Sequence, residues 1–122
     1  MKKLVICLLL LSGCGLSASN VKEFIPGTYV RDFQQQYSSG SDTLIINLAD
    51  EVTGRYNIGR HLGYVSVRDG KALDAKKEKQ MWVALYNADT KQLVIQRTGR
   101  LVSFSPEKQS LAIGNSVYNK IK

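Results

Sequence analysis

The chain has 122 residues, with 17 Lys and Arg against 10 Asp and Glu, a formal net charge of +7 and two cysteines. This length fits a single domain. A basic balance favours anionic partners, namely lipid headgroups, cell-surface polysaccharide, nucleic acid or an acidic protein face. It equally suits a solvated surface that keeps a small domain soluble. The charge therefore narrows the class of partner without assigning one.

The first residues have the pattern of a secretory signal. Lys2 and Lys3 precede the apolar run Leu4–Leu11, and the small residues Ser12 and Gly13 follow. Eight apolar residues span only about 12 Å as a helix, whereas a bilayer core needs about 20 residues. A transmembrane helix is therefore not expected, and residues 1–13 are predicted to be a signal peptide.

Leu11-Ser12-Gly13-Cys14 resembles the lipobox of bacterial lipoproteins. The resemblance implies that the chain is cut before Cys14 and that Cys14 carries acyl chains such as palmitate. The alternative is an ordinary cleaved signal with an incidental cysteine. If Cys7 leaves with the signal and Cys14 is acylated, the mature chain has no free thiol and no disulfide. Its 109 residues carry 15 basic and 10 acidic side chains, because Lys2 and Lys3 are lost, and the net charge becomes +5.

Cys14 and the small polar residues that follow, 14–23, are predicted to form a flexible tether. From residue 24 to 122, short apolar runs alternate with turn residues every eight to twelve positions, which is typical of an all-β domain. Asp69-Gly70 is a strong hairpin signal. The expected strands cover 27–33, 42–48, 54–60, 64–68, 81–86, 92–98, 101–104, 111–113 and 117–121.

One stretch breaks this pattern. Lys71–Lys79 contains mostly helix formers and four lysines, and we expect an exposed, partly ordered loop because so short a helix is marginal in water. Short turns make consecutive strands neighbours, which predicts a single antiparallel meander of about eight or nine strands. Closure into a small or lipocalin-like barrel removes exposed edges and is our first choice. A sandwich or a strongly bent open sheet is the alternative.

The sequence shows no constellation of catalytic residues. His61 is the only histidine and lies between Gly59 and Gly63, which predicts an exposed turn. One histidine without a thiolate cannot form a multi-His or Cys metal site, and no nucleophile elbow or phosphate-binding loop is present. We therefore expect a protein that is not an enzyme, with no catalytic residue, no metal and no cofactor.

Arginines and aromatic residues are interleaved on the expected strands. Such a surface can bind anions and stack rings, although tyrosines in the core and arginines outside are the more ordinary arrangement. The candidate contacts for an anionic partner are Arg55, Arg60, Arg68, Lys76, Lys77, Lys79, Arg97 and Arg100. A lipid tether outside the cytoplasm makes nucleic acid an unfavourable partner.

The chain is also similar to small cell-envelope lipoproteins of the Bacteroidota, some of them associated with conjugative transposons. The residues that carry this similarity are Ile25–Val30, Asp42–Leu44, Tyr56–Ile58, Gly70-Lys71, Trp82, Tyr86, Ser103–Pro106 and Gly114–Ile121. The similarity lies in the order of hydrophobic and turn residues. It implies a cell-envelope location and a mobile-element setting, and it implies no activity.

The sequence therefore predicts a protein anchored through Cys14 in the inner or outer membrane of a Gram-negative bacterium, facing the periplasm or the cell surface. Its β domain is expected to bind a protein or glycan partner, as an accessory of a surface or conjugation apparatus. A lipocalin-like carrier of a small apolar ligand is the alternative. A hydrolase and a binder of anionic polymer are less favoured.

Overall fold

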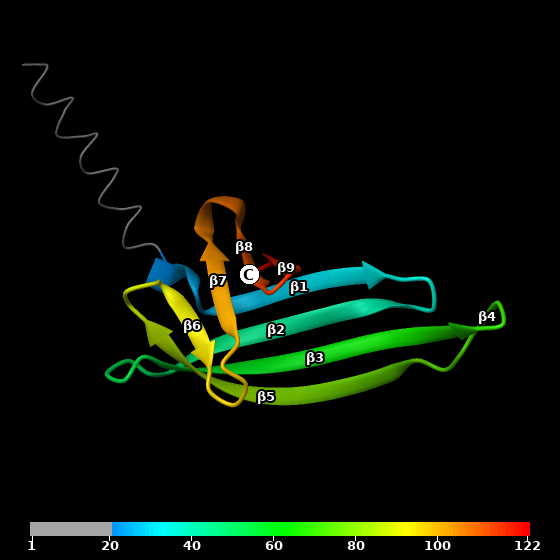
Figure 1. Ribbon diagram of the computed structural model, residues 1–122, viewed down its shortest axis with the longest axis horizontal. Coiled ribbons are helices and arrows are strands. Elements are labelled where there is room, and N and C mark those ends of the chain that lie inside the picture. Colours follow the sequence, from blue (N-terminus) through cyan, green and yellow to red (C-terminus); the bar gives the residue numbers. More distant parts are fainter. Residues whose placement is uncertain (1–20) are drawn as a thin grey trace, which may run out of the picture.

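The computed structural model describes residues 21–122 and shows an all-β domain (Figure 1). All strand pairings are antiparallel. The strands are β1 (Gly27–Gln34), β2 (Ser38–Asp50), β3 (Arg55–Arg68), β4 (Lys71–Ala72), β5 (Lys76–Asn87), β6 (Gln92–Ile95), β7 (Leu101–Ser105), β8 (Ser110–Ile113) and β9 (Ser116–Lys120), with a short 3-10 helix at Pro106–Lys108. The predicted signal peptide, the lipobox with Cys14 and the tether up to residue 20 lie outside the described residues.

Eight of these strands close into a barrel, and β4 is an extra strand on β3. Neighbouring strands follow the chain from β1 to β9, and β9 returns to pair with β1 through Tyr29–Lys120 and Val30–Asn119. The predicted antiparallel meander and its closure into a small barrel are thus confirmed. The turn at Asp69-Gly70 is also confirmed, with φ angles of 54° and 75°, as a hairpin with two left-handed residues requires.

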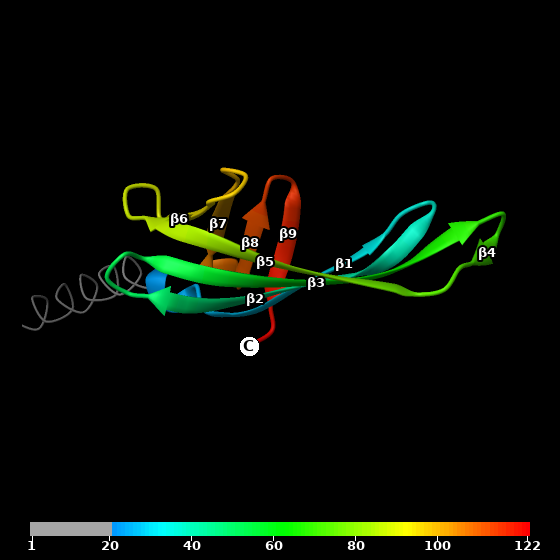
Figure 2. The same cartoon turned by 90° about the horizontal axis from the view of Figure 1, so that it is seen from below.

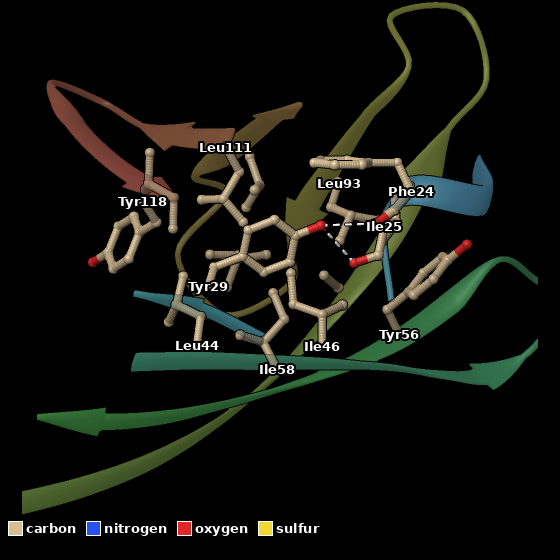
Figure 3. Packing of buried hydrophobic residues seen from close by; sticks show 14 residues of the cluster. Phe24, Ile25, Tyr29, Leu44, Ile46, Tyr56, Ile58, Leu93, Leu111 and Tyr118 are labelled. Atoms are coloured by element: carbon tan, nitrogen blue, oxygen red, sulfur yellow. Dashed lines mark hydrogen bonds between the residues drawn. The ribbon is translucent and has the colours of Figure 1, made fainter. Parts of the chain in front are cut away.

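The barrel interior is filled with side chains from alternate positions of its strands (Figure 3). Strand alternation places every second residue on one face. Tyr29 stands at the centre, fully buried, and its hydroxyl donates to the carbonyl oxygens of Phe24 and Ile25, each at 2.9 Å. The buried hydrophobic residues are Phe24, Ile25, Tyr29, Leu44, Ile46, Tyr56, Ile58, Ala84, Leu93, Ile95, Val102, Leu111, Ile113 and Tyr118.

A helical turn over residues 21–24 closes one end of the barrel. Phe24 is buried and packs edge-to-face against Tyr29 and Phe104, with ring centroids 5.8 and 6.3 Å apart. The ammonium of Lys120 donates to the Phe24 carbonyl oxygen at 2.6 Å and lies 4.2 Å from the centroid of its ring. Residues 21–23, which we expected to belong to the tether, are therefore helical, and Val21 contacts the core.

The four long strands extend beyond the barrel as a twisted sheet, which we call the wing (Figure 2). It consists of β4 with residues 31–34 of β1, 38–42 of β2, 60–68 of β3 and 76–82 of β5. The strands β6 to β9 have only four or five residues each, whereas β3 has 14 and β5 has 12. Strands β2, β3 and β5 therefore run past the point where the short strands can pair with them, and the wing has no second layer.

Two sequence expectations about this region are wrong, and they share one cause. Gly59–Gly63 is part of the continuous strand β3 rather than a turn, because neither glycine adopts the positive φ that a turn would use. Continuous β3 then offers a partner to Lys76–Lys79, which pair with His61–Tyr64 in β5 rather than forming a loop. Only residues 73–75 of the expected loop lie outside strands.

Two glycines of the wing provide a matched test of the close approach between β2 and β3. A Cβ on Gly40 would overlap the carbonyl oxygen of Gly63 and lie 2.7 Å from the Cα of Tyr64, whereas a Cβ on Gly63 meets nothing within 4 Å. We expect Gly40→Ala to lower the free energy of unfolding by about 1–3 kcal/mol, as overpacking does. Gly63→Ala should leave it equal or slightly higher. Urea denaturation measures both, and equal effects of the two substitutions would contradict the close approach.

Candidate functional site

A buried carboxylate marks the mouth of the barrel where the wing begins. Asp42 of β2 is 1% exposed. Its oxygens accept from Nε and Nη2 of Arg60 on β3, at 3.0 and 2.8 Å, and from the Tyr118 hydroxyl on β9 at 2.7 Å. The guanidinium also lies over the Trp82 ring of β5, 5.7 Å from its centroid. One carboxylate thus links side chains from four strands.

The network fixes the charge states of Arg60 and Tyr118. The hydrogen bond to Asp42 raises the pKa of the Arg60 guanidinium above its ordinary value, against the opposing effect of partial burial. Burial, assisted by the hydrogen bond to Asp42, raises the pKa of Tyr118 to about 12. A buried charge is tolerated only when it is paired and hydrogen-bonded. Arg60 therefore remains cationic and Tyr118 neutral over the physiological pH range.

A basic groove of about 590 Å³ lies beside this network. Four cationic side chains line it, and no carboxylate is among its lining residues. Its residues are Arg60, Lys79, Gln80, Met81, Trp82, Ile95, Arg97, Thr98 and Arg100. Within residues 21–122 the only salt bridge is that of Arg60 with Asp42, so Lys79, Arg97 and Arg100 are not neutralised by a described acidic side chain.

The groove exists because β5 continues past the end of its neighbour β6. β6 pairs with β5 only over Ala84–Asn87. The chain then leaves β5 in a tight turn, in which Gly99 N donates to the Ile95 carbonyl at 2.7 Å. This turn holds Arg97 and Arg100 across from the unpaired part of β5. Among the residues that line the groove, Arg60 and Trp82 are half-buried, whereas Lys79 and Met81 are exposed.

The structure brings together half of the basic residues selected from the sequence. Arg60, Lys79, Arg97 and Arg100 share the basic groove. Arg68 and Lys76 line a separate cleft at the tip of the wing. Lys77 lines another cleft of the wing, and Arg55 is exposed at the start of β3.

His61 is exposed as expected, but it lies in a strand, between Thr43 and Lys79 in the pairing register. In the described part of the chain, no group of three or more His, Cys, Asp and Glu side chains is placed to hold a metal ion.

Asp42 and Tyr118 have roles that the sequence analysis missed. The sequence did contain a signal for Asp42, because every second residue of a strand faces the same side and Asp42 shares its side with the interior residues Leu44 and Ile46. A charged residue at an interior position indicates a buried, paired charge. Arg60 has the same phase relative to Ile58, but the turn expected at Gly59–Gly63 concealed it.

Comparison with protein-family models, with curated proteins and with solved structures found no match to this chain. Within residues 21–122, no helix has both the length and the apolar character needed to cross a membrane. The site must therefore be interpreted from its geometry.

The Tyr118 hydroxyl allows a test by pH. Its folded-state pKa of about 12 lies above the ordinary tyrosine value of 10.0. The stabilisation from neutral Tyr118 is therefore complete below pH 10 and is lost as the pH rises from 10 to 12. Tyr118→Phe should lower stability at pH 7 by about 1.5–3 kcal/mol, the value of a hydrogen bond to a charged group, and the deficit should narrow above pH 10.

Urea unfolding at pH 7, 9, 10.5 and 11.5 measures this deficit. Tyr37→Phe, which removes a hydroxyl from a 66% exposed residue, is the control and should change stability at pH 7 by no more than about 0.5 kcal/mol. A Tyr118→Phe deficit that stays constant from pH 9 to 11.5 would contradict the role given to this hydroxyl.

Proposed function

We propose that the protein is a lipid-anchored, non-enzymatic binding module of the cell envelope, which uses its wing to contact a protein or glycan partner. The wing is the observation that carries this proposal. The core of the domain is complete within the barrel, yet four strands continue beyond it. A sheet exposed on both faces adds little to stability, because it buries little apolar surface. The length of the wing is better explained by contact with another molecule.

The direction of the wing supports presentation away from a membrane. Residues 21–26 lead into β1 at the capped end of the barrel, and β1 runs from there toward the tip of the wing (Figure 1). β3 contains 14 residues, which corresponds to about 45 Å at the usual strand rise. A lipid on Cys14 would thus hold the capped end near the bilayer, while the wing points outward.

The filled interior favours a surface site over an internal one. Tyr29, Leu44, Ile46 and Ile58 are all fully buried at the centre of the barrel. Small eight-stranded barrels either fill with side chains or hold one ligand, and this barrel follows the first pattern. A carrier of an apolar ligand, the alternative from the sequence, therefore gains no support from the interior.

The non-enzymatic part of the proposal is supported by the barrel mouth. Asp42, the buried carboxylate there, already accepts hydrogen bonds on both oxygens from Arg60 and a further one from Tyr118. A general base needs a free lone pair directed at substrate, and this carboxylate has structural partners instead. The similarity to Bacteroidota lipoproteins supports the envelope setting and a role as accessory to a surface or conjugation apparatus.

The anchor is tested by Cys14→Ser. Because the β domain has its own core, we expect this variant to fold with an unchanged unfolding midpoint. It should lose acylation and appear in the soluble fraction, whereas the unaltered chain sediments with membranes. Fractionation, mass spectrometry of the N-terminal peptide and circular dichroism provide the three measurements. Membrane retention of Cys14→Ser to the level of the unaltered chain would refute the anchor.

The binding surface is tested by photocrosslinking in the native envelope. A photoreactive residue replaces Tyr37 at the wing tip in one variant and Val117 on the barrel wall in another, two positions that are 66% and 53% exposed. We expect a discrete, saturable adduct from position 37 and only diffuse background from position 117. Enzymatic digestion of the adduct with protease or glycosidase distinguishes a protein partner from a glycan. Equal labelling from both positions, or none from either, would contradict the use of the wing.

A further inference from the structure

The strand β5 leaves one edge of the wing without a partner. Residues 76–82 of β5 pair with β3 on one side, and among the described residues nothing pairs with them on the other. The next residue, Val83, directs its backbone groups to this same side, since its carbonyl oxygen accepts from Gln96 N at 2.8 Å. Peptide groups alternate sides along an antiparallel strand. The N–H and C=O groups of Lys77, Lys79 and Met81 therefore point outward, and we call this row the open edge.

The open edge and the basic groove are one feature. Four consecutive residues of the groove, Lys79 to Trp82, belong to β5, so the backbone groups of Lys79 and Met81 face into it. Arg97 and Arg100 stand on its other side. The groove therefore offers outward peptide groups at strand spacing, flanked by cations and by the half-buried ring of Trp82.

From this arrangement we propose that an extended, acidic segment of another protein adds to the open edge as a further strand. The proposal rests on the binding function proposed above and specifies its partner. Backbone hydrogen bonds give such strand addition its affinity, and alternate side chains give it specificity. An unpaired row of peptide groups is satisfied by another peptide backbone, which a glycan does not supply.

Charge selects the occupant. Lysines on an edge strand normally prevent indiscriminate pairing between sheets, and at the open edge Lys77 and Lys79 act together with Arg97 and Arg100. Opposite charges directly across a strand pair stabilise it, whereas like charges destabilise it. A strand with acidic residues at alternate positions would place carboxylates beside these cations. A neutral strand would form no such ion pairs, and a basic strand would be repelled by the cations.

A second copy of this chain is a poor occupant. The chain has 10 acidic residues, and no two of them lie at positions i and i+2. The opposite edge of the wing, residues 31–34 of β1, contains Arg31 and Asp32 and so presents no run of negative charge. The complementary strand must therefore come from another protein.

Trp82 supplies the readout, because it is the only tryptophan in the chain and lines the groove. The full chain in mild detergent is titrated with an eight-residue peptide that alternates glutamate with valine and threonine. We expect a saturable change in Trp82 emission that weakens as salt rises, because the contacts at the edge are solvent-exposed. A peptide with lysine in place of each glutamate should bind at least about tenfold more weakly.

N-methylated peptides separate strand addition from simple charge attraction. Only one set of alternate amides in an added strand faces β5. Methylation of that set should abolish binding, and methylation of the other set should leave the dissociation constant within about threefold. Strand addition would be overturned if the two methylated peptides bound with the same dissociation constant, whether both were weakened or neither was. A dimer in solution without peptide that is lost in Lys79→Pro would show that a second copy occupies the edge and would also overturn the proposal.

Variants of the chain complete the test. Lys77→Glu with Lys79→Glu should weaken the acidic peptide at least about tenfold, whereas Lys108→Glu with Lys122→Glu, the same change in net charge outside the groove, should have little effect. If both pairs weaken it equally, or the titration shows no saturable binding, the inference fails. Photocrosslinking at position 37 distinguishes failure of strand addition from failure of the binding function proposed for the wing. A wing adduct that persists in the Lys77/Lys79 variant would leave the binding function standing while strand addition falls.

Discussion

The ion pair between Asp42 and Arg60 is the contact on which the transition from barrel to wing depends. It lies where the apolar interior ends, and it joins β2 to β3 while Tyr118 and Trp82 bring in β9 and β5. A buried carboxylate in such a place costs several kcal/mol unless every lone pair is satisfied. Here it is satisfied by Arg60 from β3 and Tyr118 from β9, so the network holds only when these strands are in their correct register with β2. The pair therefore specifies where the barrel stops as much as it stabilises the fold.

Unequal strand lengths explain why a wing exists at all. Four short strands complete the barrel wall, and the long ones have nothing to pair with beyond it except one another. Their open edges would invite aggregation in a less charged sequence. Placing Lys76, Lys77 and Lys79 on the β5 edge removes that hazard without adding a covering layer. The same charges leave the backbone accessible to a strand of opposite charge. One set of lysines can therefore both prevent aggregation and favour an acidic partner.

The architecture was readable from sequence because its signals are local. Alternating runs such as Asp42–Leu48 and the Asp69-Gly70 turn predict the meander, and they favour its closure into a barrel over a sandwich or a bent open sheet. The wing was not readable, because Gly59 and Gly63 look like turn residues and only pairing with β2 and β5 shows that they are extended. The sequence identifies the basic residues of the groove, because arginines and lysines on expected strands can be named as candidates. It does not show that Arg97 lies near Lys79, because that proximity depends on β6 leaving β5 at Ile95. Long-range pairing of that kind leaves no mark on local composition.

The two ends of the molecule have opposite chemistry, and this difference gives the fold a direction. At the capped end, Phe24, Tyr29 and Phe104 seal the barrel, and Lys120 is held against the Phe24 ring and carbonyl. That end is ordered by the entering chain itself, since Tyr29 binds the carbonyls of Phe24 and Ile25. At the other end the strands carry lysines, an open edge and no cover. The chain thus enters the domain at the sealed end, and the open edge of β5 lies at the opposite end of the same sheet.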